Sequence, residues 1–355
     1  MTGSESRPGA IPLERVCIVM LSTAGGAVWT LPVVNAIKRA HATAHVTWMI
    51  QPGAAALVDG HPAVDELILF DRARGLGGFI EVRRQLESRR FDVVLVLQTY
   101  LKASIVSSFV RAPFKLGFDR ARARDLSWLF TNRTIAPHPV QHAQDQFLEF
   151  AAALGLAIGP AEWNLGPWAD ERPWQKEFFA PLERQAVSMV VATSKPEKDW
   201  LPERWAEVSD ALWHDFGLEP VIVGGRSVRE LYAEAVILER ARHKPRSALG
   251  SGLRRLISIL DGSAFAIAPD TGPLHMAVAI ERPVISLLGY SNPKRTGPYR
   301  RYQDLIVDAY GEPGENYPIS MQKRPGRMSR ITVRDVLDRV ERWKSFYSAS
   351  SGPKG

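Results

Sequence analysis

The chain has almost no cysteine. Its 355 residues include one, Cys17. A single cysteine excludes an internal disulfide and disfavours a cysteine-based metal site. Cys17 stands inside the apolar run 15–21, and no histidine or acid in its neighbourhood is placed to activate it. We therefore expect Cys17 to be a small core residue.

Long hydrophobic runs are also missing. No stretch approaches the ~18 apolar residues that a membrane-spanning helix requires. Residues 1–14 are polar and contain no apolar core of signal-peptide length. These absences predict a protein without a membrane span or a secretion signal, and hence a cytoplasmic location.

The common nucleotide and nucleic-acid motifs are absent. No G-x-G-x-x-G follows the first apolar run, and G-x-x-x-x-G-K-[ST] occurs nowhere. No helix-turn-helix, zinc or RNA-recognition pattern is present either. The net charge of +7, with 45 Lys and Arg residues, nevertheless favours anionic partners such as phosphorylated small molecules or acidic lipid headgroups. Nucleic acid is the weakest of the anionic candidates, because no groove-reading or aromatic motif accompanies the basic residues.

The apolar pattern predicts an α/β protein with two domains. Short apolar runs typical of buried strands alternate with helical periodicity in each half of the chain. These runs are 15–21, 44–50, 66–70 and 91–97, and then 186–192, 219–223, 264–268 and 284–288. Residues 155–182 between the halves are rich in Gly, Pro and Trp, which is typical of a linker. Right-handed crossovers would make each half a doubly wound parallel sheet.

The stretch 264–288 is the most informative part of the sequence. Two apolar runs enclose a turn and a short helix, a βαβ unit in which Pro273 suits the first helical turn. Gly272 allows close approach to a ligand, and Asp270 or Thr271 could cap the helix. The open helix N-terminus would then bind a phosphate, with His275 one turn further in. A capped turn with a structural histidine fits the same spacing equally well.

Two other loops follow predicted strands of the second half. The loop 192–200 offers the hydroxyls of Thr193 and Ser194 together with the ammonium of Lys198, and a Gly224-Gly225 pair follows the next strand. Each alone is an ordinary polar loop or turn. Ligands of parallel sheets, however, bind outside the carboxyl ends of the strands. Three such loops on one sheet favour an anion site over three unrelated turns.

Two motifs carry a resemblance to a known family. The run T-S-x-x-x-K-x-W at 193–200 and the run D-T-G-x-x-H-x-A at 270–277 resemble the signatures of glycosyltransferase family 9, the heptosyltransferases of lipopolysaccharide core synthesis. The first half resembles the family in several further segments. These are the turn 30–32, Gln98 with Lys102, residues 117–120, Arg124, residues 132–133 and His142. The resemblance spans about residues 15–307, and its second-half motifs are the most specific part.

The resemblance implies a GT-B architecture, in which two doubly wound Rossmann-like domains face each other across a cleft. Residues 1–165 would form the acceptor-side domain, 166–182 the linker and 183–355 the nucleotide-sugar domain, with the option that the last helix packs back on the first domain. It also implies metal-independent, inverting transfer of a sugar, without a cofactor. The donor would be a nucleotide-diphosphate sugar, with ADP-heptose as the first candidate. The acceptor would be a lipopolysaccharide core or another anionic saccharide or lipid, reached by peripheral contact at the inner face of the inner membrane.

The resemblance also assigns residues by position. The donor residues would contact the diphosphate and the sugar, and the acceptor residues would meet the anionic acceptor. The donor residues are Thr193, Ser194, Lys198, Asp270, Thr271, Gly272 and His275. The acceptor residues are Lys102 and Arg124. The resemblance assigns no metal ligand.

The sequence departs from the family at the catalytic base. The family places an acid directly after the glycine of its first loop, where this chain has Gly26, and a histidine three residues later, where this chain has Trp29. A glycine cannot accept a proton from the acceptor hydroxyl. The catalytic residue therefore stays unassigned, with Asp119 and His142 as candidates. A second departure follows Gly225, because the acid expected to hold the ribose appears only later in the chain.

That departure leaves two alternatives open. The chain could be a nucleotide-sugar-binding protein with lost or altered catalysis. It could also be a GT-B enzyme with another outcome, such as an epimerase or a hydrolase.

Overall fold

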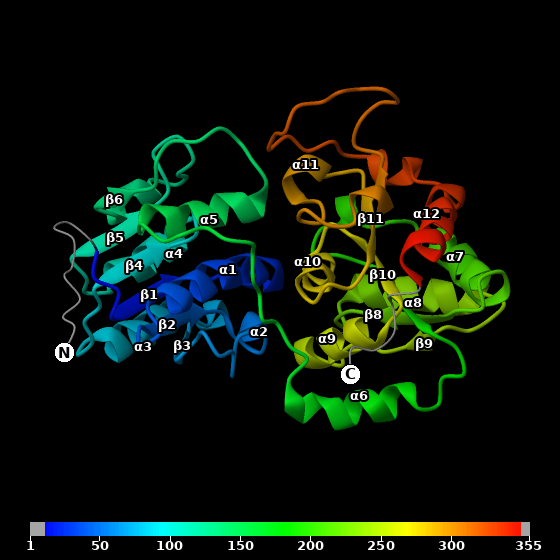
Figure 1. The fold of residues 1–355 in the computed structure, drawn as a ribbon, viewed down its shortest axis with the longest axis horizontal. Coiled ribbons are helices and arrows are strands. Elements are labelled where there is room, and N and C mark those ends of the chain that lie inside the picture. Colours follow the sequence, from blue (N-terminus) through cyan, green and yellow to red (C-terminus); the bar gives the residue numbers. More distant parts are fainter. Residues whose placement is uncertain (1–10, 349–355) are drawn as a thin grey trace. The chain divides into compact units, whose positions relative to one another are not determined.

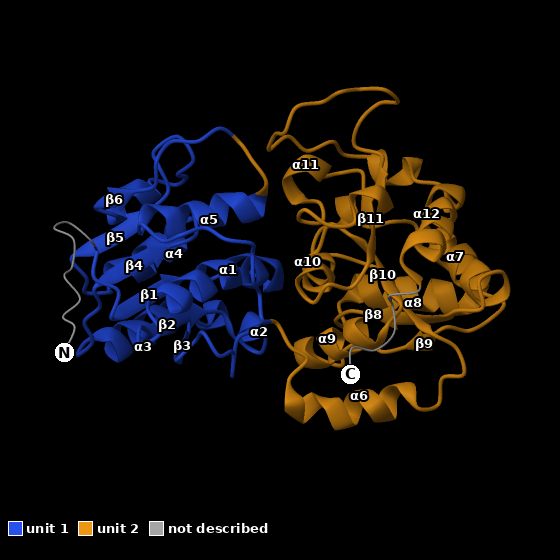
Figure 2. Cartoon of the chain, in the orientation of Figure 1, with its two compact units in different colours: residues 1–139, 143–164 blue, residues 140–142, 165–355 orange. Residues whose placement is uncertain are grey.

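The computed structural model describes residues 11–348, which fall into two compact units (Figures 1 and 2). Unit 1 contains the chain up to Pro139 together with Ala143–Asn164, and unit 2 contains Val140–His142 and the chain from Leu165 onward. Residues 1–10, which belong to the polar start without an expected secretion signal, lie outside the described residues. Each unit is built on its own parallel sheet.

Unit 1 contains a six-stranded parallel sheet in the order β3-β2-β1-β4-β5-β6. Its strands are β1 (Arg15–Val19), β2 (His45–Ile50), β3 (Glu66–Leu69), β4 (Val93–Val96), β5 (Phe114–Gly117) and β6 (Arg133–Thr134). Its helices are α1 (Ala24–Ala40), α2 (Pro52–Ala55), η1 (Arg72–Arg74), α3 (Leu76–Leu86), α4 (Leu101–Ser108), η2 (Ser127–Phe130) and α5 (Ala143–Ala153). The four apolar runs of the first half are all strands, as predicted.

The central strands of unit 1 are buried because helices cover both faces of a parallel sheet. β1 pairs with β2 on one side and with β4 on the other, and β4 is buried along its whole length. Cys17 of β1 is fully buried, and this burial raises the pKa of its thiol well above the ordinary value. Cys17 is therefore the inert core residue that the sequence predicts.

Unit 2 contains a second six-stranded parallel sheet, in the order β12-β11-β10-β7-β8-β9. Its strands are β7 (Ala186–Val190), β8 (Glu219–Val223), β9 (Arg246–Ser247), β10 (Phe265–Pro269), β11 (Val284–Leu288) and β12 (Ile306–Asp308). Its helices are η3 (Ala169–Glu171), α6 (Arg172–Phe179), η4 (Pro196–Lys198), α7 (Pro202–His214), α8 (Val228–Arg240), α9 (Leu253–Gly262), α10 (Gly272–Ala279), α11 (Pro293–Thr296), η5 (Gln303–Leu305), η6 (Arg327–Arg330) and α12 (Val333–Phe346).

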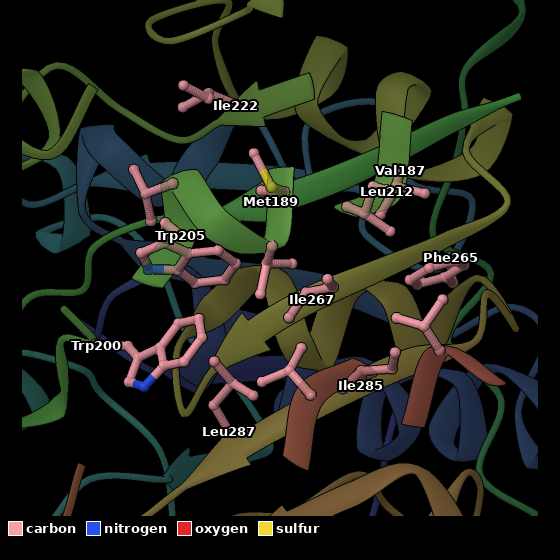
Figure 3. Packing of buried hydrophobic residues seen from close by; sticks show 14 of the residues in the cluster. Val187, Met189, Trp200, Trp205, Leu212, Ile222, Phe265, Ile267, Ile285 and Leu287 are labelled. Carbon is pink, nitrogen blue, oxygen red and sulfur yellow. The ribbon is translucent and has the colours of Figure 1, made fainter. Parts of the chain in front are cut away.

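The core of unit 2 lies on the central strands and continues into two tryptophans (Figure 3). Trp200 and Trp205 meet edge to face with their ring centroids 5.1 Å apart. The Trp200 indole donates a hydrogen bond to the carbonyl of Ile331 at 3.0 Å. Because Trp200 ends the loop that follows β7, this contact anchors that loop to the core.

Residues 166–182 contain more structure than their composition predicts. Within this stretch, Arg172–Phe179 form helix α6, which packs against α9. Pro173 stands in the first turn, where a proline without an N–H group is tolerated. The Gln175 amide donates to the carbonyl of Ser258 at 2.7 Å and to the Asp261 carboxylate at 3.0 Å. These tertiary contacts stabilise a helix that has no periodic apolar face long enough to reveal it.

No helix within residues 11–348 has both the length and the apolar character to cross a bilayer. The last helix, α12, packs against α7 and β12 within unit 2. A capping box between Thr332 and Asp335 fixes its start.

The buried centre of β10 predicts a large penalty for truncation. We expect Ile267→Ala, at a fully buried position between β7 and β11, to lower the free energy of unfolding by about 2–5 kcal/mol, because it leaves a cavity. The matched control is Val228→Ala, at a side chain that is 84% exposed, which should change stability by less than about 0.5 kcal/mol. Urea denaturation followed by tryptophan fluorescence measures both values. Equal effects at the two positions would contradict the assignment of the core.

Candidate functional site

The strand order of unit 2 creates a switch point between β7 and β10. The chain continues from β7 to β8 and β9 on one side of the sheet, and β10 and β11 lie on the other side. The loops that follow β7 and β10 therefore diverge from neighbouring strands. Such a divergence at the carboxyl edge is where open α/β sheets bind their ligands.

Three polar side chains meet at this switch point. Lys198, from η4 after β7, places its Nζ 2.7 Å from Asp270 Oδ2 and 3.1 Å from the Asp270 carbonyl oxygen. His275, one turn into α10, has its Nε2 3.7 Å from Asp270 Oδ1. Asp270 and His275 are buried and Lys198 is partly buried. The two motifs, 72 residues apart at Lys198 and Asp270, thus form one charged cluster.

The electrostatics of the cluster keep Asp270 ionised. Burial alone raises the pKa of its carboxyl, but His275 and the Lys198 ammonium outweigh that effect and hold the pKa well below its ordinary value. The cluster therefore carries a fixed carboxylate at neutral pH. Its negative charge offsets that of Lys198, so the pair adds no net charge.

The start of helix α10 remains uncapped by side chains. Thr271 occupies the N-cap position but makes no side-chain capping hydrogen bond, and the Asp270 carboxylate is engaged with Lys198. The prediction that Asp270 or Thr271 caps the helix is therefore wrong. Asp270 uses its carboxylate in the ion pair with Lys198, and the Thr271 side chain makes no capping hydrogen bond. The first amide groups of α10, at Gly272 and beyond, point their partial positive charge toward the switch point.

The loop after β7 is held by its own hydrogen bonds. The Thr193 hydroxyl donates to the carbonyl of Lys195 at 2.7 Å and accepts from the Lys195 amide at 3.0 Å. Asp199 accepts from the Thr193 amide and pairs with Arg229 at 3.0 Å. Ser194 is exposed. Thr193 thus shapes the loop, while the Ser194 hydroxyl faces solvent.

The Glu230 carboxylate, from the first turn of α8, lies against the loop after β8, although Glu230 stands later in the sequence than the family's pattern places its acid. Gly224 has φ +152°, and a side chain there would also meet Glu230 Oε1 at 2.6 Å. The Glu230 carboxylate accepts from the amides of Gly225 at 2.6 Å and Ser227 at 2.8 Å. The first turn of α8 therefore brings this acid back to the Gly224-Gly225 loop. In the sequence, the capping-box pattern of Ser227 and Glu230 is the one signal for this position of the Glu230 carboxylate.

The two residues predicted to meet the acceptor lie in unit 1. Lys102 is exposed on the first turn of α4, and Arg124 is exposed on the turn that precedes η2. α4 packs against η2, so both residues belong to one part of that unit.

Both candidates for the catalytic base make contacts within their own units. The Asp119 carboxylate is buried and pairs with Arg122, which also binds Glu149 at 2.7 Å. His142 Nε2 lies 3.0 Å from the carbonyl of Gly297, and its ring lies 5.0 Å from that of Tyr299. Asp119 is therefore part of a structural ion-pair network.

Gly26 is buried in the first turn of α1, next to Ser22. A Cβ atom at position 26 would lie 2.7 Å from the Cβ and 2.8 Å from the Oγ of Ser22. The Ser22 side chain thus occupies the space that a side chain at position 26 would need.

Among residues 11–348, no group of three His, Cys, Asp or Glu side chains is placed to hold a metal ion.

Comparisons with known sequences agree with the two motifs. The family model described as glycosyltransferase family 9 (heptosyltransferase) matches residues 79–323. The chain is 30% identical to the lipopolysaccharide core heptosyltransferase OpsX of Haemophilus influenzae, over 94% of this chain and 98% of that protein. It is 29% identical to the lipopolysaccharide heptosyltransferase 1 of Pseudomonas aeruginosa, over 81% and 82% of the two chains.

Solved structures share the same fold. A glycosyltransferase family 9 protein from Veillonella parvula superposes with a TM-score of 0.79 at 22% identity, covering 93% of this chain and 96% of the other. The Escherichia coli heptosyltransferase WaaC with ADP superposes with a TM-score of 0.72 at 23% identity, covering 94% and 99%. Both likenesses extend over nearly the whole of each chain.

The low pKa of Asp270 predicts a pH-dependent contribution to stability. We expect Asp270→Asn to lower the free energy of unfolding by about 3 kcal/mol at pH 7, because Lys198 loses its buried counter-charge. The pKa of Asp270 is lower in the folded state than in the unfolded state, so its ion pair stabilises the fold fully above the unfolded-state pKa of about 4. This contribution to stability is lost as the pH falls toward the folded-state pKa. Urea denaturation should therefore give a constant difference from pH 7 to 5 and a smaller one at pH 3.

The control for this experiment is Asp215→Asn, at an exposed position after α7. This variant should cost less than about 0.5 kcal/mol at every pH. A difference between the wild type and Asp270→Asn that grows toward pH 3 would contradict the assigned direction of the pKa shift.

Proposed function

Since the chain belongs to glycosyltransferase family 9, the heptosyltransferase family, we propose that it transfers a heptosyl group from ADP-heptose to a lipopolysaccharide-core or other anionic glycan acceptor. Its fold is the GT-B fold of that family, with one Rossmann-like sheet in each unit. The observation that supports this proposal most strongly is the cluster of Lys198, Asp270 and His275 at the switch point of unit 2. The relatives named above support the heptosyl donor and the lipopolysaccharide acceptor.

In this proposal, unit 2 binds the nucleotide-diphosphate sugar. Lys198 Nζ and the amide groups at the start of α10 contact the diphosphate, and the exposed Ser194 hydroxyl adds a hydrogen bond. Thr193 acts by shaping the loop that carries Ser194 and Lys198. Residues Asp270, Thr271, Gly272 and His275 surround the diphosphate and the sugar. Glu230, whose oxygens keep lone pairs after accepting from two amides, binds the ribose.

The proposed reaction is a displacement at the anomeric carbon. The acceptor hydroxyl oxygen forms a bond to that carbon, the bond from the carbon to the diphosphate oxygen breaks, and ADP leaves with the bonding electrons. Attack opposite the leaving group inverts the configuration. Lys198, His275 and the α10 amides stabilise the negative charge that gathers on the diphosphate, and these interactions strengthen in the transition state. This set of protein groups supports our inference that transfer needs no metal.

Unit 1 would bind the acceptor. Lys102 and Arg124 are exposed cations in one part of that unit, which suits an anionic saccharide. The proton of the acceptor hydroxyl must pass to a base, and this base stays unassigned. We propose a cytoplasmic location, at the side of the membrane where a sugar nucleotide is available.

We also propose peripheral contact of unit 1 with a membrane surface. Leu76 and Ile80, four residues apart on α3, are 82% and 69% exposed. They lie on one helix face, and the exposed Arg83 and Arg84 follow one turn later. Outward aliphatic side chains beside arginines suit an anionic lipid surface.

Gly26 supports a second candidate function, nucleotide-sugar binding with lost or altered catalysis. The family's acid is missing at this position, and Ser22 fills the space where it would stand. A binding protein of this kind would retain ADP affinity without transferring the sugar. The activity measurement that follows separates the two functions.

The proposed donor site predicts a specific loss of activity. We expect Lys198→Ala to lower kcat for heptosyl transfer from ADP-heptose to Kdo-lipid A by about 10²–10³-fold, because one preorganised donor to the leaving diphosphate is removed. Lys176→Ala, at an exposed residue of α6 outside the site, is the charge-matched control and should keep wild-type activity. Activity that persists in EDTA is expected for both the wild type and this control. Wild-type activity in Lys198→Ala would overturn the donor site, whereas ADP binding without any transfer by the wild type would favour the second candidate function.

The exposed face of α3 predicts vesicle binding. We expect the wild type to float with phosphatidylglycerol-containing vesicles, and Leu76→Glu with Ile80→Glu to bind roughly tenfold more weakly, because two apolar side chains no longer enter the lipid interface. The control is Ile158→Glu, at another exposed aliphatic residue of unit 1, which should float like the wild type. Failure of the wild type to float would contradict the membrane contact and leave the transfer reaction unaffected.

A further inference from the structure

The segment 309–330 links β12 to α12, and ion pairs hold it in place. The Arg324 guanidinium donates to both carboxylate oxygens of Glu315, at 2.6 and 2.7 Å, and to the carbonyl of Tyr310 at 2.9 Å. Its carbon lies 4.5 Å and 5.8 Å from the ring centroids of Tyr310 and Tyr317. A bidentate pair between aromatic rings is a rigid arrangement. Arg324 therefore fixes the neighbouring residue, Lys323.

Two further arginines anchor the same segment. Arg327 and Arg330 each pair with the Glu312 carboxylate, at 2.7 and 2.8 Å. Arg327 also donates to the carbonyl of Tyr310 at 2.6 Å. These contacts join distant parts of the segment (Figure 1). They therefore fix its path although residues 311–326 form no helix and no strand.

The segment meets the sheet at its carboxyl edge. The Arg324 amide donates to the carbonyl of Tyr290 at 3.0 Å, and Lys323 forms an antiparallel bridge with Ser291. Tyr290 and Ser291 follow β11, the neighbour of β10. Lys323 Nζ lies 3.5 Å from Ser291 Oγ and 5.8 Å from the centre of the Tyr290 ring. Lys323 thus reaches the edge at which Asp270 follows β10.

The ammonium of Lys323 lies in the electric field of the donor cluster. Partial burial lowers its pKa, Asp270 raises it, and Lys198, Arg295 and Lys195 lower it further. Among residues 11–348, no carboxylate forms an ion pair with Lys323. The ammonium groups of Lys198 and Lys195 repel that of Lys323 at this edge, and an added anion would relieve this repulsion.

The charges of the donor cluster indicate that a further cation would help to bind a diphosphate. Asp270 offsets the charge of Lys198, so this pair alone gives a diphosphate no net positive partner. We propose that Lys323 is a further binding residue for the diphosphate of the donor, an inference that rests on the proposed function. Its ammonium approaches the anion from the β11 side, opposite the loop after β7 that carries Lys198.

The test compares ADP affinity among variants by isothermal titration calorimetry. We expect Lys323→Ala to weaken ADP binding about tenfold, as loss of a charge-assisted contact to phosphate does. Lys323→Arg should retain most of the affinity, and adenosine should bind the wild type and Lys323→Ala equally. Lys176→Ala removes the same charge from unit 2 outside the site and should bind ADP like the wild type. None of the Arg324 contacts involves the Lys323 side chain, so its removal should leave them intact and the melting temperature unchanged.

The outcomes separate this inference from the proposed function. ADP binding that Lys198→Ala weakens and Lys323→Ala leaves unchanged would overturn the role of Lys323 while the donor site stands. Equal weakening by Lys323→Ala and Lys176→Ala would show a general charge effect and would also overturn it. A wild type that binds no ADP would overturn both the inference and the donor site.

Discussion

The partly buried ion pair between Lys198 and Asp270 is the interaction on which the donor site depends. Burying two charges costs desolvation energy, so such a pair is weak evidence for stability. Its position has a geometric consequence, because it ties the loop after β7 to the start of α10 across the switch point. Two residues after Lys198, the Trp200 indole anchors the end of the loop in the core. The Lys198 ammonium is thus held between a rigid core and an open helix end.

The fold could be predicted largely because its central strands are continuous apolar runs. β1, β4, β7 and β10 are buried on both faces, so their sequences contain almost no polar residue. The two-residue edge strands β6 and β9 escaped detection because pairing with a neighbour, rather than their own pattern, defines them. Helix α6 escaped for a similar reason, since its contacts with α9 come from a distant part of the chain.

The site could be predicted only where its chemistry is local in sequence. The motifs that hold Lys198 and His275 indicated two loops, and the parallel sheet explains why they meet. The prediction that Asp270 caps the helix was wrong, because its carboxylate pairs with Lys198, 72 residues away in the sequence. Glu230 and Lys323 could not be placed from the sequence. Glu230 contacts the Gly224-Gly225 loop only because the first turn of α8 directs its carboxylate there. Lys323 belongs to a segment whose path depends on the contacts of Arg324.

The contact between Gly26 and Ser22 makes these two positions epistatic. A carboxylate introduced at position 26 would collide with the Ser22 side chain, so the single exchange would disturb α1 before it could supply any new chemistry. The order of changes therefore matters: glycine at position 22 must come first, because alanine would keep the Cβ atom that lies 2.7 Å from the new side chain. A lineage, or a protein engineer, moving between this loop and one with an acid has to pass through that intermediate.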